Sequence, residues 1–202
     1  MTEDLSPRMR ILEAAITCID KDGINNLTTR KIAEQAGTNI ASINYYFRSK
    51  DNLMAEALSM TLRHLQHDME ALIANPEQPF LENVKDIFVY LIECGVHFPG
   101  VTLAHLYSPL VEKRLDSMGV EAMRSIFKML EPYTAREFPD LPIETIRNAL
   151  VQVLSSAIFT TLSPGFFQPL VGMDLTQPED VRKLAGYLTR LLAQALKITQ
   201  IE

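Results

Sequence analysis

A short segment near the N-terminus carries side chains that could read the edges of nucleic-acid bases. Residues 39–47 contain amides and hydroxyls but no carboxylate. Ile43 and Phe47 stand four positions apart, so a helix would place both on one side, where they could enter a core. The positions that point elsewhere are Ala41, Ser42, Asn44 and Tyr45. A surface without carboxylates tolerates phosphates, and an amide can pair bidentately with adenine, so the segment indicates a helix suited to DNA.

Two short helices must position this surface. Thr28 can cap a helix that runs to Ala36, where Gly37 supplies the positive-φ stop. A further short helix then runs to about Phe47. The length of both helices and the glycine turn between them are typical of a helix-turn-helix, whose second helix enters the DNA major groove.

Flanking segments complete the N-terminal domain. Ser6 and Pro7 are an N-cap and a first-turn proline, and they open a helix that stops at Gly23. Residues 49–51 open a much longer helix that reaches toward residues 75–76. Three short helices therefore precede one long connector.

The order and spacing of these residues resemble the DNA-binding domain of the TetR family of bacterial transcriptional regulators. The resemblance rests on residues 27–33, on Ala36 and Gly37, and on residues 43–53, and it covers about residues 8 to 55. Beyond that point the chain is similar to the family only in length, helical pattern and the kind of its last two helices. The resemblance implies a helix-turn-helix at about residues 28–47.

The resemblance also implies a role for individual side chains. The residues expected to contact phosphates are Thr29, Thr38, Asn39, Tyr45, Tyr46 and Lys50. The residues expected to read bases are Arg30, Ala41, Ser42 and Asn44. Arginine can fork onto guanine, asparagine can pair with adenine, and alanine can touch a thymine methyl group.

Two positions depart from the family pattern. Asn44 stands where the family usually has Tyr, and Ile40 where it often has Lys, Arg or Pro. Asn44 either reads a base or is simply solvated, and Ile40 either packs inward or reaches the groove. A different interpretation of the whole segment is a small packed subdomain in which residues 45–47 are core.

Helical spacing of apolar residues continues to the C-terminus and predicts an all-α fold. The expected helices after the long connector span about residues 80–98, 101–117, 120–137, 143–162 and 178–199. We expect a DNA-binding domain at residues 5–65, joined by the long helix to a larger ligand-binding and dimerisation domain at residues 66–202. A helix shared by both domains would link them mechanically.

Two late helices carry wide apolar stripes. Family resemblance places them in a four-helix homodimer interface, with these residues expected in it: Leu150, Val151, Leu154, Ile158, Leu184, Leu188, Leu191, Leu192 and Ala195. The alternative is that both stripes face only the core of their own chain.

A cavity for a small hydrophobic effector is expected within residues 80–175, where methionines and aromatic residues are frequent. The residues expected to line it are Cys94, His97, His105, Met123, Phe127 and Phe159. Such residues are more often plain core. We expect no cofactor and no metal: His97 and His105 are eight positions apart, and His64 and His67 beside Asp68 fit a solvated face better than a metal site.

Composition narrows the possible functions. The 19 basic and 25 acidic residues give a net charge of −6, which argues against binding to nucleic acid or membranes by bulk charge. The first 60 residues carry 7 basic and 8 acidic groups, so few ionic phosphate contacts are expected there. Two cysteines without a CxxC motif, an acidic N-terminus and an uncharged stretch interrupted by Pro164 favour a cytoplasmic protein without a membrane span.

Three function classes compete for this sequence. The resemblance implies a repressor that leaves its operator, a palindromic DNA site, when an effector binds. An enzyme is disfavoured because the chain has no GxSxG, HExxH or Gly-rich phosphate loop, and no catalytic residue is expected. An architectural protein or an adaptor for protein partners, binding DNA without an inducer, is the remaining alternative.

Overall fold

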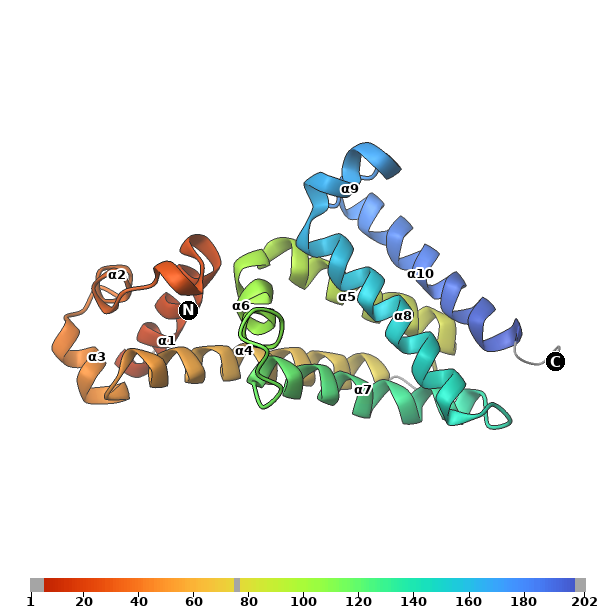
Figure 1. Ribbon diagram of the computed structural model, residues 1–202, viewed down its shortest axis with the longest axis horizontal. Coiled ribbons are helices and arrows are strands. Elements are labelled where there is room, and N and C mark those ends of the chain that lie inside the picture. Colours follow the sequence, from red (N-terminus) through yellow and green to blue (C-terminus); the bar gives the residue numbers. More distant parts are fainter. Residues whose placement is uncertain (1–5, 75–76, 199–202) are drawn as a thin grey trace. The chain divides into compact units, whose positions relative to one another are not determined.

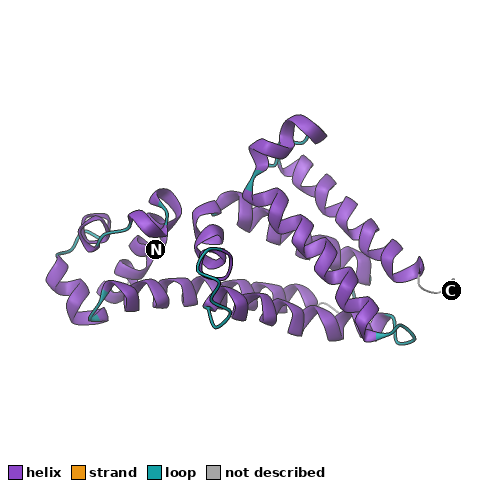
Figure 2. Cartoon of the chain, viewed as in Figure 1, coloured by secondary structure: helices purple, strands orange, loops and turns teal. Residues whose placement is uncertain are grey.

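The computed structural model describes residues 6–74 and 77–198, and every regular element within them is a helix (Figure 2). The elements are α1 (Pro7–Asp22), the 3-10 turn η1 (Ile24–Asn26), α2 (Thr29–Gln35), α3 (Ile40–Phe47), α4 (Lys50–Ile73), α5 (Phe80–His97), α6 (Pro99–Leu110), α7 (Met118–Glu137), α8 (Ile143–Leu162), α9 (Pro164–Val171) and α10 (Pro178–Ile198). The predicted all-α fold is confirmed. The expected first residue of the N-terminal domain, Leu5, and the expected last residue of the final helix, Thr199, lie outside the described residues.

One helix was not predicted. Residues 164–171 form α9, which begins with Pro164 at its first position and ends at Gly172 in the left-handed region, with φ +67°. The segment is apolar except for Gln168, and none of its residues is buried. Pro164, Gly165 and Pro169 are residue types that usually interrupt a helix, so the sequence does not predict one here.

The chain divides into two compact units. Among the described residues, the first comprises 6–65 together with Gly100–Glu121, and the second comprises 66–74, 77–99 and 122–198. The long helix α4 continues from the first unit into the second. Helix α6, which the sequence places within the C-terminal domain, therefore groups with the DNA-binding elements.

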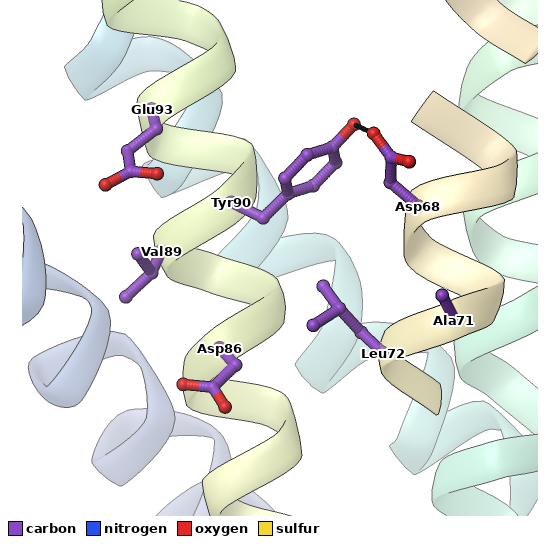
Figure 3. Close-up of a pocket in the computed structure, with 7 residues that line it drawn as sticks. All are labelled: Asp68, Ala71, Leu72, Asp86, Val89, Tyr90 and Glu93. Atoms are coloured by element: carbon purple, nitrogen blue, oxygen red, sulfur yellow. Dashed lines mark hydrogen bonds between the residues drawn. The ribbon is translucent and has the colours of Figure 1, made fainter. Parts of the chain in front are cut away.

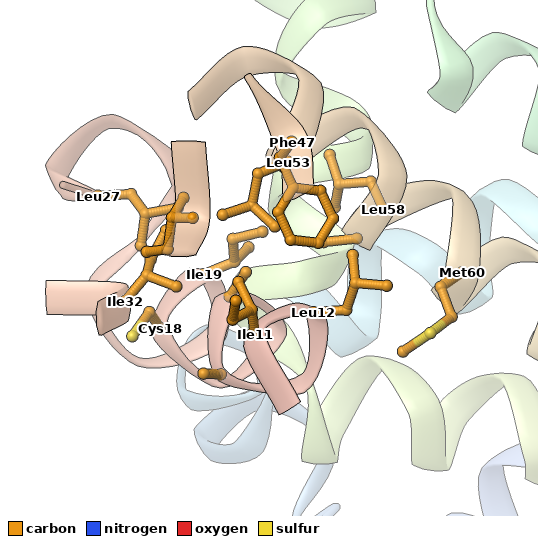
Figure 4. Packing of buried hydrophobic residues seen from close by; sticks show 14 of the residues in the cluster. Ile11, Leu12, Cys18, Ile19, Leu27, Ile32, Phe47, Leu53, Leu58 and Met60 are labelled. Carbon is orange, nitrogen blue, oxygen red and sulfur yellow. The ribbon is translucent and has the colours of Figure 1, made fainter. Parts of the chain in front are cut away.

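The core of the first unit joins α1, α2, α3 and the first half of α4 (Figure 4). Ile11, Leu12 and Ile19 form the buried stripe of α1, and Phe47 and Leu53 pack against it. The same cluster includes Val101 and Ala104, from α6. Burial of these apolar side chains is the main force that holds the three short helices together.

Polar contacts fix α6 to this core. Oδ1 of Asp20 accepts hydrogen bonds from the backbone N–H groups of Gly100 at 2.9 Å and Val101 at 3.3 Å. A carboxylate at a helix N-terminus satisfies otherwise unpaired N–H groups and complements the helix dipole. The end of α1 therefore caps α6.

A buried histidine makes a second contact between α6 and α4. The hydroxyl of Thr61 donates to the carbonyl of Leu58 at 2.8 Å, so its oxygen accepts from Nε2 of His105 at 2.9 Å. Nδ1 of His105 is buried without a hydrogen-bond partner. Burial lowers the pKa of His105 to about 4, so the ring stays neutral at physiological pH.

The second unit is built around α5, which packs against both α8 and α10 (Figure 1). Its buried residues include Ile87 and Ile92 on α5, Leu154 on α8 and Leu188 on α10. The buried amide of Asn83 donates to the hydroxyl of Tyr133 at 2.9 Å, which satisfies the polar group on the core face of α5. Within residues 6–74 and 77–198, no single helix has the length and hydrophobicity needed to cross a membrane.

The close approach of Gly100 to α1 gives a testable prediction. A Cβ at Gly100 would meet the backbone oxygen of Asp20 at 2.2 Å, and a backbone atom cannot move aside cheaply. Gly100→Ala should therefore lower the free energy of unfolding by about 1–3 kcal/mol, measured by urea denaturation.

The matched control is Gly165→Ala. Gly165 also follows a proline at the start of a helix, but a Cβ there would meet nothing within 4 Å. Equal stability of the native protein and Gly100→Ala would contradict this account of how α6 is fixed.

Candidate nucleic-acid interface

The turn between α2 and α3 is held by local contacts. Gly37 adopts φ +62°, a conformation that favours glycine, and the N–H of Thr38 donates to the carbonyl of Ala33 at 2.9 Å. Oδ1 of Asn39 then caps α3 by accepting from the N–H of Ser42 at 2.9 Å. Together these contacts set the direction in which α3 leaves α2.

Helix α3 has one buried face and one bare face. Ile43 and Phe47 are buried, as the four-residue spacing predicts, with 0% and 2% of their surface exposed. Ile40 is 44% exposed, which answers the question left open by the sequence: this side chain does not pack in the core. Ala41 and Asn44 are also exposed, and α3 contains no carboxylate.

The aromatic run at the end of α3 is divided between the two faces. Tyr45 is 80% exposed, and its ring meets that of Tyr46 edge to face with centroids 5.0 Å apart. The guanidinium of Arg8 lies over the ring of Phe47, 5.1 Å from its centroid, and pairs with Glu56. Only Phe47 is core, so the interpretation of residues 45–47 as a core run is wrong for both tyrosines.

The predicted cations are tied to the protein by single contacts. Nζ of Lys50 donates to the carbonyl of Leu27 at 2.7 Å, which links the start of α4 to the entry of α2. Nε of Arg30 pairs with Glu34 at 3.1 Å across one helical turn, with both side chains well exposed. An exposed pair of this kind contributes about 0.3–0.5 kcal/mol, so Arg30 is easily released to another partner.

Arg48 is a cation that the sequence reasoning missed. It follows α3 directly, is exposed and adopts φ +64°. The sequence signal was its position immediately after the last helical residue, where a side chain is turned out of the helix. Its guanidinium belongs to the same unit as the bare face of α3.

Comparison with known proteins shows what the N-terminal segment is similar to. Residues 11–57 match the family model described as bacterial regulatory proteins, tetR family. The probable HTH-type transcriptional regulator YttP of Bacillus subtilis is 24% identical over 189 residues, which cover 86% of each chain. Residues 11–57 are therefore a domain of the TetR type of bacterial regulatory proteins.

Solved structures share the fold of this chain. The regulator FadR from Bacillus subtilis, in complex with stearoyl-CoA, has a TM-score of 0.67 and 15% identity, over 93% of this chain and 98% of that one. The multidrug binding protein EbrR, complexed with malachite green, has a TM-score of 0.61 and 24% identity, over 91% of this chain and 96% of that one. At such identities the likeness shows the fold alone.

The structure changes the expectation for α8 and α10. Five of the nine side chains expected in the interface are buried within their own unit, each with at most 8% of its surface exposed: Leu150, Leu154, Leu184, Leu188 and Leu192. They pack there because α5 lies against both helices. These five side chains face the core of their own unit, and the expected interface stays a prediction.

The exposed apolar surface of α8 and α10 is smaller than the sequence predicts. Val151 is 47% exposed and Leu191 is 37% exposed, while Ile158 and Ala195 are partly buried. Tyr187, which the sequence reasoning did not select, is 51% exposed on α10. Its signal was its position four residues before Leu191, on the same side of the helix.

The second unit has an open groove of about 490 Å³ between α4 and α5 (Figure 3). Its lining residues are Asp68, Ala71, Leu72, Asp86, Val89, Tyr90 and Glu93. None of the six residues expected to line an effector cavity is among them. His105 belongs to the first unit, and Phe159 is 60% exposed.

The other four expected pocket residues belong to the second unit but do not line the groove. His97 is exposed, with Nδ1 2.9 Å from the carbonyl of Glu93, and Met123 and Phe127 are partly buried on α7. Burial raises the pKa of the Cys94 thiol, which keeps it protonated one turn from Tyr90.

Carboxylates give the groove its electrostatic character. The hydroxyl of Tyr90 donates to Oδ2 of Asp68 at 2.7 Å, and burial together with this bond raises the pKa of the phenol (Figure 3). Asp86 accepts from the amide of Gln78 at 2.7 Å. Three carboxylates and a neutral phenol thus border an otherwise apolar lining. Among the described residues no cluster of three or more His, Cys, Asp or Glu side chains is arranged to hold a metal ion.

Proposed function

We propose that this TetR-family regulator is a cytoplasmic repressor that binds a palindromic operator as a dimer and leaves it when a small molecule binds. The observation that carries the proposal is the bare face of α3. It is free of carboxylates, presents Ala41, Asn44 and Tyr45, and is held rigidly by the turn at Gly37 and the cap at Asn39. A preformed surface of this kind suits the major groove.

The hydrogen-bond geometry supports finer roles for the polar side chains. The Ser42 hydroxyl donates to Oδ1 of Asn39 at 3.2 Å, so its lone pairs face outward as acceptors for a base amino group. The amide of Asn39 keeps both N–H donors for a phosphate. Lys50 uses one of its three donors on Leu27, which leaves two for a phosphate at the start of α4.

Base reading falls to Asn44 and Arg30. Asn44 is exposed on α3, where its amide can pair with an adenine. Arg30 exchanges its weak pair with Glu34 for a guanine or a phosphate. Phosphate contacts by Thr29, Thr38, Tyr45 and Tyr46 fix the register in which these two side chains meet the bases.

A second copy of the chain binds the second half-site of the operator. The exposed apolar residues Val151, Tyr187 and Leu191 on α8 and α10 support a two-fold interface formed by these helices. A dimer of this kind reads two half-sites whose centres lie about 34–36 Å apart, or one helical turn of DNA.

Release of the operator requires an effector that binds the released state more tightly than the DNA-competent state. Helix α6 supports such coupling, because its N-terminus is capped by Asp20 of α1 and its residues Val101 and Ala104 lie in the core beneath α2 and α3. The groove between α4 and α5 supports an effector site on the other unit of the same long helix.

The chemistry of that groove favours an aromatic or apolar cation. Asp68, Asp86 and Glu93 attract positive charge, while Leu72 and Val89 offer apolar contact. Of the ligands held by the two structural relatives, malachite green is a cationic dye and stearoyl-CoA carries several negative charges. The carboxylates of this groove support the cationic class.

Operator recognition gives a prediction for Asn44 and Tyr45. Asn44→Ala should lower affinity by about 5- to 150-fold, the equivalent of 1–3 kcal/mol, only for sequences with the preferred base at one position of each half-site. Tyr45→Ala should weaken binding to all sequences alike, because phosphate contacts carry no sequence information. Fluorescence anisotropy against a set of single-base operator variants measures both effects.

The matched control is Asn148→Ala, which removes an exposed asparagine from α8. The salt dependence of native binding should also be shallow, far from a slope of about −10 in log affinity against log salt. A uniform loss with Asn44→Ala would show that this residue does not read a base.

The dimer gives a second prediction. The double variant Val151→Glu, Leu191→Glu places two charges on the exposed apolar face of α8 and α10, and it should sediment as a monomer at micromolar concentration. Gln152→Glu adds a charge to a neighbouring exposed position and should leave the dimer intact. A native protein that sediments as a stable monomer would overturn the proposed interface.

The effector groove gives a third prediction, with malachite green as the probe. The dye should release the native protein from its operator, and the double variant Asp86→Asn, Glu93→Gln should bind the dye roughly 5- to 10-fold more weakly because two attracting charges are lost. Glu70→Gln, an exposed carboxylate of α4 outside the groove lining, is the control. Unchanged dye affinity in the double variant would place the cation elsewhere.

A further inference from the structure

Basic side chains converge where α5 packs against α10. Lys85 from α5 and Arg182, Lys183 and Arg190 from α10 line a groove of about 390 Å³, together with Glu179 and Gly186. All six residues belong to the second unit. The chain as a whole carries a net charge of −6, so this cluster does not follow from a basic composition.

Only one of the four cations is neutralised by a neighbour. Nζ of Lys183 lies 3.0 Å from carboxylate oxygens of both Glu179 and Asp180, and these carboxylates raise its pKa. Across the residues that the structure describes, Lys85, Arg182 and Arg190 form no ion pair. Three of the four cations are therefore unpaired, and the four cations with Glu179 and Asp180 sum to a net charge of +2.

The side chains of two of these cations, Lys85 and Arg190, lie near Gly186. A Cβ built on Gly186 would lie 3.6 Å from Nη1 of Arg190 and 3.8 Å from Cε of Lys85. Both side chains thus approach the same open point beside a residue that has no side chain of its own. Two positive charges without a counter-ion repel each other. An anion bound between them attracts both and offsets this repulsion.

We propose that this groove, which we call the α5–α10 cation groove, binds the phosphate group of a small phosphorylated molecule. The planar guanidinium of Arg190 can donate two parallel hydrogen bonds to phosphate oxygens, while the ammonium of Lys85 approaches from the other helix. Arg182 contributes a third charge one turn from Gly186.

The arrangement favours a small molecule over a nucleic-acid backbone. A row of phosphates needs a row of cations, whereas here the cations face one another across a single groove. The carboxylates of Glu179 and Asp180 border it and would repel the neighbouring phosphates of a continuous strand. The site is also independent of the proposed operator binding, since none of its residues belongs to the unit that contains α3.

Isothermal titration of the full chain with inorganic pyrophosphate at low salt tests the site. We expect saturable binding at one site per chain, weakened roughly fivefold or more by Lys85→Gln and by Arg190→Gln, because each removes a charge-assisted hydrogen bond. Lys128→Gln removes an exposed cation of α7 and should leave pyrophosphate affinity unchanged. Circular dichroism of each variant confirms that the helices are retained.

Two further arms separate the possible anions. Citrate, which carries carboxylates only, should bind more weakly than pyrophosphate, and random-sequence duplex DNA should not compete for the site. The proposal is overturned if the native protein fails to bind pyrophosphate, if Lys128→Gln weakens binding as much as Arg190→Gln, or if duplex DNA displaces pyrophosphate. Operator binding, measured separately, has no bearing on any of these outcomes.

Discussion

The DNA-binding unit depends on how one eight-residue helix divides its surface. Ile43 and Phe47 anchor α3 in a core shared with α1 and α4, and they leave the other face of the helix bare. Because α3 is so short, two buried side chains, the cap at Asn39 and the positive φ of Gly37 carry almost all of its orientation. Rigid local anchoring of this kind is what recognition needs, since a side chain that reads a base edge must arrive in a fixed register.

Local interactions explain which parts of the fold could be predicted from the sequence. The caps at Ser6 and Thr28 and the stop at Gly37 act within a few residues, so the N-terminal helices were predicted close to their observed bounds. Side chains on wide apolar stripes were harder to place. On α10, apolar residues cover more than one side, and only the position of α5 determines that Leu184, Leu188 and Leu192 face inward while Tyr187 faces outward. The groove between α4 and α5 was missed because its lining combines carboxylates with residues from two helices, a pairing that periodicity does not reveal.

The distribution of charge assigns different chemistry to different surfaces. The face of α3 lacks carboxylates although the chain is acidic, and its cations are few and individually tethered. In the second unit, the α4–α5 groove gathers carboxylates, whereas the α5–α10 cation groove gathers four cations, three of them unpaired. Helix α5 thus separates two surfaces of opposite charge, which suit ligands of opposite charge.

We propose that α3 reads a specific sequence twice, once in each copy of a dimer. Genome-wide capture of the DNA fragments bound by the native protein tests this proposal. We expect a few discrete promoter sites, each an inverted repeat whose half-site centres lie about one helical turn apart. Many dispersed sites without a shared repeat would indicate an architectural protein, and the absence of any enriched fragment would contradict a DNA-reading function.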